Sequence, residues 1–171
     1  ALPILKGSSY QPLPKFIANK KAIINIKNKD NKCFLWCVLA HLHPVKHNAE
    51  RINNYKQYLD EFADTPENAY PMKLDRIQYF EKRYNLRIFV YTYDEEAKSV
   101  VPLKFSSRKD GELIQLFYYD KHYSYIKDFN KLIGGGEGNF RFCVNCLSPF
   151  RSRVAFNEHV KNCTGSEKVE M

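Results

Sequence analysis

The sequence lacks the segments that would place a protein in or across a membrane. Its 171 residues contain no run of about 18 apolar residues, the length that a transmembrane helix requires. The first residues, Ala1 to Lys6, also lack the charged, apolar and small-residue regions of a secretory signal peptide. We therefore expect no membrane partner, and we expect the protein to work in the cytoplasm or the nucleus.

Cysteine is present in an odd number, which argues against a framework of disulfides. Three of the five cysteines fall in one cluster near the C-terminus, namely Cys143, Cys146 and Cys163. The other two, Cys33 and Cys37, lie one helical turn apart and would form a poor disulfide. This usage is typical of reduced thiols and supports an intracellular location.

Positive charge is in excess but is not concentrated in one segment. The net charge is +8, and the densest basic pairs are Lys20-Lys21 and Arg108-Lys109. A basic balance can indicate nucleic-acid binding, but a scattered excess is more typical of an ordinary solvated surface. Hydrophobic residues make up 44% of the chain and include 12 Tyr and 12 Phe, which is enough for a large globular core.

Helical patterns dominate the first half of the chain. The segment that begins at Cys33 is apolar on nearly every side, and Asp30 or Asn31 can cap its start, so it predicts a buried helix that ends before Pro44. Two later segments have amphipathic helical spacing. The elements predicted for this half are an extended arm, a short strand and three helices, at 1–20, 22–26, 33–42, 49–62 and 72–84.

From Leu86 onward apolar and polar residues alternate, which predicts strands. Helices followed by an antiparallel sheet make an α+β fold. The glycine-rich run 134–138 predicts a flexible linker between a domain at 1–133 and a small module at 139–171 that is far from the chemistry. The predicted strands, separated by charged or glycine-containing turns, are 87–91, 100–105, 112–119 and 122–127.

The C-terminal module carries the spacing of a metal site. Cys143, Cys146, His159 and Cys163 follow the pattern Cys-x2-Cys-x12-His-x3-Cys. Zinc binds thiolates and imidazoles tetrahedrally, and a short knuckle followed by a helix can supply all four ligands. The spacing therefore predicts one structural Zn²⁺ in a small ββα zinc finger.

The module resembles the common DNA-binding fingers, with Phe150 and Phe156 at their two core positions and cysteine as the fourth ligand. Arg151 and Arg153 are placed to contact phosphate, which would give weak nucleic-acid contact. A single finger covers only about three base pairs, so a structural or protein-binding role is the favoured interpretation.

Cys33 is the candidate nucleophile. It lies within the first turn of the predicted buried helix, where the helix dipole and unpaired amide groups favour a thiolate. The same amides can form part of an oxyanion hole, as in papain-like cysteine proteases. A buried cysteine is more often just a small apolar residue, so this position alone is a weak signal.

A histidine late in the same domain strengthens the hypothesis. His122 opens a predicted strand and can serve as the base, and Asp120 shares its face if the strand runs through both residues. If Asp120 instead lies in a hairpin turn, Asp128 or Asn130 is the reserve candidate for the third residue. For the oxyanion donor we favour Asn28, five residues before the cysteine, with Asn25 as second choice.

These segments resemble a known group of enzymes. The segment Asp-Asn-Lys-Cys-Phe at 30–34, with His122-Tyr123, is similar to the cysteine and histidine boxes of ovarian-tumour-type deubiquitinases. The Asp-x-His pair resembles that of herpesvirus large tegument protein deubiquitinases. From about residue 25 to 163 the chain resembles viral tegument-like deubiquitinases, which are encoded by large DNA transposons and virus-like elements of invertebrates.

The resemblance implies a papain-like cysteine protease fold that cuts after the Gly-Gly tail of ubiquitin, with ubiquitin or polyubiquitin chains as partners. The sequence departs from the tegument enzymes, because Lys20 lies in the region where they place an upstream Gln. Asn28 instead has the spacing of the oxyanion Asn in ubiquitin-specific proteases. Two alternatives stay open: a protease for another ubiquitin-like modifier, and a non-enzymatic zinc-finger accessory protein of a mobile element that binds nucleic acid.

Overall fold

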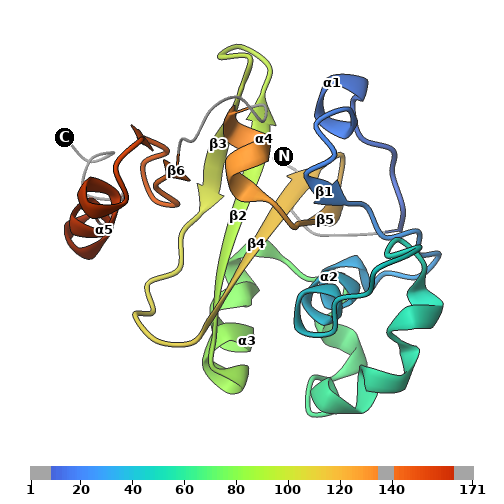
Figure 1. The fold of residues 1–171 in the computed structure, drawn as a ribbon. Helices are drawn as coiled ribbons and strands as arrows, with labels where there is room; N and C mark the ends of the chain where they lie inside the picture. The colour runs from blue at the N-terminus through green and yellow to red at the C-terminus, as the bar shows by residue number, and fades with distance from the viewer. Residues whose placement is uncertain (1–8, 135–140, 164–171) are drawn as a thin grey trace.

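The protein combines a single main sheet with helices on both of its faces, the α+β class that the sequence predicts (Figure 1). The computed structural model describes residues 9–134 and 141–163. Within these ranges no helix is both long enough and apolar enough to cross a membrane.

The main sheet is mixed, whereas the sequence predicts an antiparallel one. Its five strands lie in the order β1-β5-β4-β2-β3, and only the β2–β4 pair is parallel, with Leu86 opposite Glu112. After the β2–β3 hairpin the chain crosses to the other side of β2, so β4 runs in the direction of β2. The strands are β1 (Ile23–Ile24), β2 (Leu86–Asp94), β3 (Ser99–Lys104), β4 (Glu112–Tyr119) and β5 (His122–Ile126).

Helices α2 (Cys33–Leu42) and α3 (Ile77–Tyr84) bury their apolar sides in the larger of two cores. We call this core the front cluster; it includes Leu39, Phe80 and Leu116. Helix α2 has the predicted bounds, and all its side chains from Cys33 to Ala40 are buried. The predicted cap is wrong, because Lys32, and not Asp30 or Asn31, is the N-cap residue and no side chain caps the helix. A helix that is apolar on every side is stable only when protein surrounds it, which explains its place beside β5.

The helix predicted at 49–62 is wrong, and the one predicted at 72–84 is α-helical only from Ile77. In the first segment, side chains occupy backbone carbonyls that would otherwise accept the first hydrogen bonds of an α-helix. Asn54 Nδ2 donates to the Asn48 carbonyl, and Tyr55 Oη donates to the Ala49 carbonyl. Two 3-10 turns, η1 (Ile52–Asn54) and η2 (Lys56–Phe62), take the place of that helix. Two more follow it, η3 (Glu67–Ala69) and η4 (Leu74–Arg76).

The opposite face of the sheet carries a second core, which we call the back cluster. Two short helices cover it, α1 (Lys15–Ala18) and α4 (Phe129–Gly134). They bury Ile17 and Leu132 against strand residues such as Tyr91. The sequence predicts neither helix, because four and six residues are too few for a helical period to emerge.

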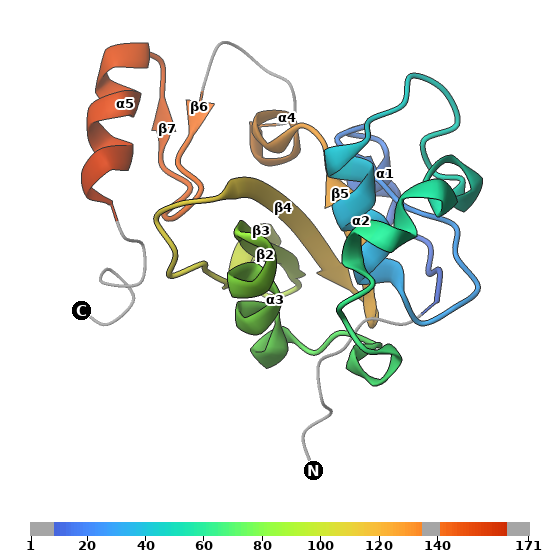
Figure 2. The ribbon, with the colours of Figure 1, turned by 90° about the horizontal axis from the view of Figure 1, so that it is seen from below.

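The C-terminal module consists of β6 (Arg141–Phe142), β7 (Pro149–Phe150) and α5 (Arg153–Asn162). It packs on the back cluster through Val144 and Leu147, and Tyr91 Oη donates a hydrogen bond of 2.8 Å to the Val144 carbonyl. Figure 2 shows α4 and this module on one side of the sheet and α3 on the other. The module therefore packs against the sheet, whereas the sequence predicts an appendage on a flexible linker. Of the predicted linker, Gly134 ends α4 and 135–138 lies outside the described residues.

Candidate active site and candidate metal centre

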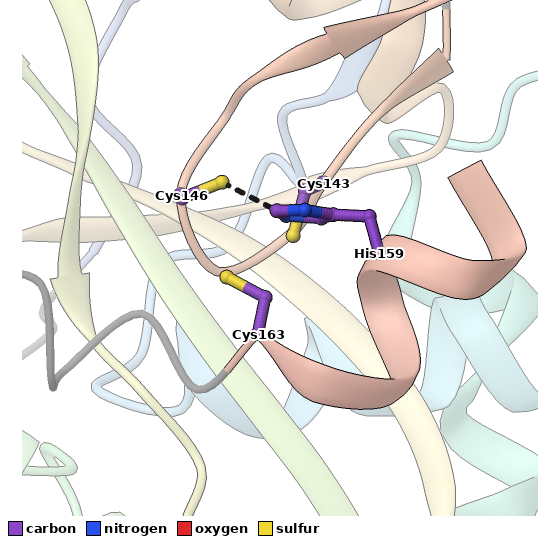
Figure 3. Close-up of side chains that lie close together, drawn as sticks. All are labelled: Cys143, Cys146, His159 and Cys163. Carbon is purple, nitrogen blue, oxygen red and sulfur yellow. Dashed lines mark hydrogen bonds between the residues drawn. The ribbon is translucent and has the colours of Figure 1, made fainter. Parts of the chain in front are cut away.

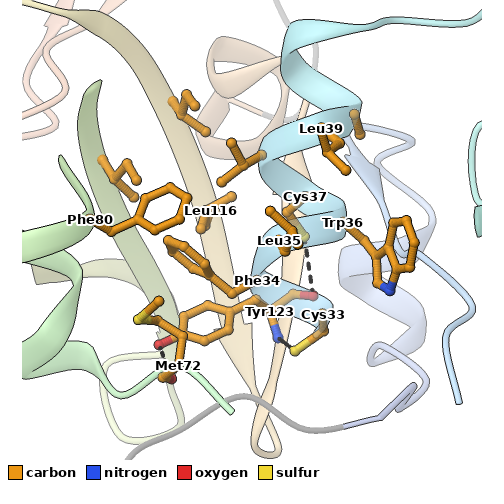
Figure 4. Close-up of a cluster of buried hydrophobic side chains, with 14 of the residues drawn as sticks. Cys33, Phe34, Leu35, Trp36, Cys37, Leu39, Met72, Phe80, Leu116 and Tyr123 are labelled. Atoms are coloured by element: carbon orange, nitrogen blue, oxygen red, sulfur yellow. Dashed lines mark hydrogen bonds between the residues drawn. The ribbon is translucent and has the colours of Figure 1, made fainter. Parts of the chain in front are cut away.

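Cys33 is the first residue of α2, and its sulfur faces the start of β5. The Tyr123 N–H donates to Cys33 Sγ over 3.4 Å, and the sulfur of Cys37, one turn further along, donates to the Tyr123 carbonyl over 3.4 Å (Figure 4). Both cysteine side chains are 0% exposed. The residue beside His122 is therefore held between the two thiols, which brings the histidine's strand to the start of the helix.

Burial decides the protonation state of Cys33. It raises the pKa of this thiol to about 12, although hydrogen bonds from the backbone amides of Tyr123 and Phe34 act in the opposite direction. The position of Cys33 at a helix start, taken alone, predicts a favoured thiolate. In this structure loss of hydration outweighs the amide groups, so Cys33 is a neutral thiol at pH 7.

The side chain of His122 is paired with Asn25. His122 Nε2 lies 2.7 Å from Asn25 Oδ1, and His122 is 1% exposed. The pairing of Ile24 with Tyr125 places Asn25 opposite Ser124, two residues from His122 and on the same face of the sheet. Ser124 Oγ also lies 3.3 Å from Asn25 Oδ1. Strand register therefore brings Asn25 to the histidine.

A second hydrogen bond sets the orientation of the Asn25 amide. Asn25 Nδ2 donates to the Gln11 carbonyl over 2.8 Å, so its Oδ1 end is turned to His122 as an acceptor. The neutral imidazole then carries its hydrogen on Nε2, and Nδ1 holds the lone pair. A histidine base oriented by an amide oxygen is one form that the nucleophile–base–orienter arrangement takes in cysteine proteases.

Asp120 lies in the β4–β5 turn. Asp120 and Lys121 both have positive φ, 50° and 61°, and Tyr119 pairs with His122, so these two residues form the turn of a hairpin. Asp120 is exposed, and among the described residues it forms no hydrogen bond to His122. The prediction that Asp120 orients the histidine fails because the strand ends at Tyr119.

The reserve candidates are engaged elsewhere. Asp128 Oδ1 accepts a hydrogen bond from the Lys131 N–H in α4, and Asn130 Oδ1 accepts one from the Phe142 N–H of the C-terminal module. Both side chains therefore organise the back of the sheet and are not brought to the histidine.

Asn28, the favoured oxyanion donor, is 2% exposed and turns its amide to Asp30. Its Nδ2 lies 3.0 Å from the Asp30 carbonyl oxygen and 2.9 Å from Asp30 Oδ1. The same carboxylate accepts from the Lys32 N–H and from Trp36 Nε1, and so organises the turn before α2. Asn28 Oδ1 is buried with no hydrogen-bond partner among the described residues. Using Nδ2 for an oxyanion would require its release from Asp30.

Sequence reasoning underrated Asn25, which it considered only as a second choice of oxyanion donor. The signal that could have found it is the pairing of two strands 100 residues apart. The two-residue strand β1 pairs with β5, and that register alone places the amide next to His122. A strand so short gives no usable alternation of apolar and polar residues.

In the C-terminal module four potential metal ligands converge: Cys143, Cys146, His159 and Cys163 (Figure 3). Their ligand atoms all lie within 4.8 Å of one another, and Cys146 Sγ is 3.2 Å from His159 Nε2. Sulfur and nitrogen ligands of a tetrahedral zinc ion lie about 3.6 Å apart, so the arrangement is close to that geometry. These four side chains could hold one metal ion.

Local structure explains the convergence. The Leu147 N–H donates to the Cys143 carbonyl, and Leu147 has a positive φ of 62°, which folds the segment between the first two cysteines into a knuckle. Ser152 Oγ accepts from the Ala155 N–H and caps α5, the helix that carries His159. Burial raises the pKa of Cys143 to about 11. Burial also raises the pKa of Cys146, but hydrogen bonds from Ser148 and His159 outweigh it and lower that pKa to about 6.

Comparison of the chain with models of protein families, with curated proteins and with solved structures finds no match.

Proposed function

We propose that the protein is a papain-like cysteine protease that acts as a deubiquitinase, with Cys33 as nucleophile, His122 as base and Asn25 as the residue that orients the base. The observation that carries the proposal is the contact between the two halves of the site. The residue next to His122 donates its N–H to Cys33 Sγ, while His122 itself is bonded to Asn25. A thiol at a helix start, a buried histidine and an orienting amide together supply the nucleophile, base and orienter that such a site requires.

In the proposed reaction Cys33 starts as a thiol. His122 takes its proton as the sulfur attacks the carbonyl carbon of ubiquitin's final glycine, and a tetrahedral oxyanion forms. Backbone amides at the start of α2 stabilise the oxyanion, with Asn28 as a further donor if its amide leaves Asp30. The imidazolium then gives its proton to the departing lysine or main-chain amine, and a thioester remains on Cys33.

Water completes the cycle. His122 removes a proton from a water molecule, the hydroxide oxygen attacks the thioester carbonyl, and the sulfur leaves. The ubiquitin carboxylic acid is released, and the proton on His122 returns to the sulfur. Asn25 keeps the imidazole in one orientation through both steps, so that the same nitrogen receives and returns the proton.

The choice of ubiquitin as substrate rests on the resemblance of segment 30–34 and of His122-Tyr123 to deubiquitinase sequences. Neither Cys33 nor His122 has appreciable exposed surface. The proposal therefore includes a movement that uncovers the sulfur before a substrate carbonyl reaches it. Reaction with a substrate-like probe measures that access directly.

In the same proposal the C-terminal module is a zinc finger. Cys143, Cys146, His159 and Cys163 hold one structural Zn²⁺, which four ligands close off from catalysis. Zinc is favoured because three thiolates and one imidazole are its preferred donors in proteins. The ion joins the knuckle to α5 and so fixes the module that packs on the back cluster.

A ubiquitin derivative with a C-terminal electrophile tests the protease. We expect a covalent adduct with the wild-type protein and none with Cys33→Ala. The matched control is Cys37→Ala, which removes the other buried thiol of the same helix and should retain the adduct. No adduct with the folded wild-type protein, or an adduct that persists in Cys33→Ala, contradicts the proposal. Parallel probes made from other ubiquitin-like proteins identify the preferred modifier.

The metal cluster supports a second candidate function, that of a nucleic-acid-binding accessory protein. Arg151 and Arg153 lie exposed at the start of α5, where finger proteins commonly contact phosphate. DNA binding that weakens steeply with salt and is lost in Cys143→Ser would support this function. If DNA binding is found together with an inactive Cys33, the accessory role is the better account.

A further inference from the structure

A described stretch of the N-terminal arm lies directly against the histidine and its partner. The Tyr10 ring meets the His122 ring edge to face, with 6.0 Å between their centroids and 70° between their planes. The main-chain carbonyl of Gln11 accepts the hydrogen bond from Asn25 Nδ2, and the Tyr10 N–H donates to the Asn28 carbonyl over 3.1 Å. One ring and two main-chain hydrogen bonds therefore connect the arm to the site.

We propose that Tyr10 and Gln11 are positioning residues for the His122 base, an inference that rests on the proposed protease function. A carbonyl oxygen can only accept, so the Gln11 main chain determines which end of the Asn25 amide faces the histidine. The Tyr10 ring, itself only half buried, covers a histidine that is 1% exposed. Each arm residue thus acts on a different part of the His122–Asn25 pair.

The cover over His122 matters because of what it does to the hydrogen bond beneath it. A hydrogen bond away from water is stronger, since water does not compete for donor or acceptor. With Tyr10 in place, Nε2–H stays on Asn25 and the basic Nδ1 keeps one direction. Without the ring, water competes for Nε2–H, the imidazole gains freedom to rotate, and a small misplacement of a base is costly in rate.

The arm does not depend on Tyr10 for its attachment to the protein. Further along the arm Ile17 is 1% exposed in the back cluster, and Lys20 Nζ donates to the Leu132 carbonyl over 2.7 Å. Substitution of the half-buried Tyr10 should therefore leave the fold intact. Tyr10→Phe supplies a matched control, because it keeps the ring that meets His122.

The test uses two variants of the full chain, Tyr10→Ala and Tyr10→Phe. Nuclear magnetic resonance of ¹⁵N-labelled protein measures how fast the His122 Nε2 hydrogen exchanges with water, and the ubiquitin probe measures the rate of adduct formation. In Tyr10→Ala we expect exchange to be about tenfold faster and adduct formation about tenfold slower, with probe affinity unchanged. Tyr10→Phe keeps the ring and should match the wild type in both measurements.

Two results would overturn the inference. One is Nε2 exchange in Tyr10→Ala that equals the wild-type rate, which would show that the ring does not protect the bond. The other is adduct formation in Tyr10→Ala that is unchanged or faster, which would make the ring irrelevant or an obstruction. A wild-type protein that forms no adduct contradicts the protease itself, and the exchange measurement then decides alone whether the arm positions His122.

Discussion

The two groups of cysteines in this molecule lie in different surroundings, one in an apolar core and the other among potential metal ligands. At the front of the sheet, the Cys33 sulfur receives backbone N–H groups, including that of Tyr123, and belongs to a cluster of buried apolar side chains. In the C-terminal module, the Cys146 sulfur contacts Ser148 and His159 and lies within 4.8 Å of three other potential ligand atoms. Burial raises the pKa of Cys33 to about 12, whereas the hydrogen bonds at Cys146 outweigh burial and lower its pKa to about 6.

The difference shows that the neighbours of a thiol decide its chemistry. Converging thiols and an imidazole fit a cation, because a metal ion neutralises the thiolates and satisfies all of them together. A buried thiol beside a histidine–amide pair, such as Cys33, fits a nucleophile that loses its proton only during the reaction. Substitutions in each group test whether the two groups are as distinct as the geometry indicates.

Metal removal should have the largest effect, and this effect should be confined to the C-terminal module. A structural zinc ion contributes an apparent 10–16 kcal/mol to the folding of an isolated finger, roughly, so Cys146→Ser or a strong chelator should release one ion and melt α5. Metal analysis and circular dichroism measure this loss. Cys33→Ser should retain the ion. A loss of metal from Cys33→Ser would show that the two groups of cysteines are not independent.

Removal of His122, the proposed base, should have the next largest effect. His122→Ala should lower kcat/KM for a ubiquitin substrate roughly 100- to 10,000-fold, because general-base catalysis by a positioned histidine contributes that much. Asn25→Ala should lower it roughly 10- to 100-fold through misorientation of the imidazole. The matched control is Asp120→Asn, which alters an exposed turn residue and should leave the rate unchanged. A large loss in Asp120→Asn with an active Asn25→Ala would restore the aspartate as the third residue.

The contrast between Asn25 and Asp120 shows where sequence reasoning reaches its limit. The buried helix at 33–42 could be predicted because its apolar run is continuous, and the metal cluster could be predicted because its ligands lie at fixed local spacing. The pairing of β1 with β5 could not, since two residues carry no periodic signal and their partner lies about 100 residues away. The partner of the histidine depends on that pairing.

The protonation state of the Cys33 thiol could not be predicted from the sequence either. The position of a cysteine at a helix start indicates stabilising amide groups, but the desolvation that opposes them depends on what the rest of the chain packs around it. Met72 and Tyr123, joined by a hydrogen bond of 3.1 Å, belong to the front cluster with Cys33 and come from distant segments. Only the assembled core reveals that burial outweighs the helix start.

The rate of alkylation should depend differently on pH for the two kinds of thiol, and this effect should be smaller than the loss of activity on removal of His122. The thiolate is the reactive form, and below its pKa the thiolate fraction increases tenfold per pH unit. Because the pKa of Cys33 is raised to about 12, its alkylation by iodoacetamide should increase about tenfold per unit from pH 7 to pH 9, without a plateau. Cys37→Ala removes the competing buried thiol, and mass spectrometry locates the label. A plateau below pH 7 would mean that His122 holds a preformed thiolate.

The smallest predicted effect concerns the contact that joins the two regions. Tyr91 is 0% exposed, and its hydroxyl donates to the Val144 carbonyl in the segment between Cys143 and Cys146. Tyr91→Phe keeps the ring packed against Phe129 but leaves that partly buried carbonyl without its donor, which costs about 1–2 kcal/mol. Chemical denaturation of the metal-loaded protein should show this loss of unfolding free energy, and Tyr93→Phe on the same strand serves as the control. If the module were an independent appendage, Tyr91→Phe would leave the stability of the module unchanged. Coupled losses in the sheet and the module would show instead that the metal site supports the back of the same sheet whose front carries Cys33.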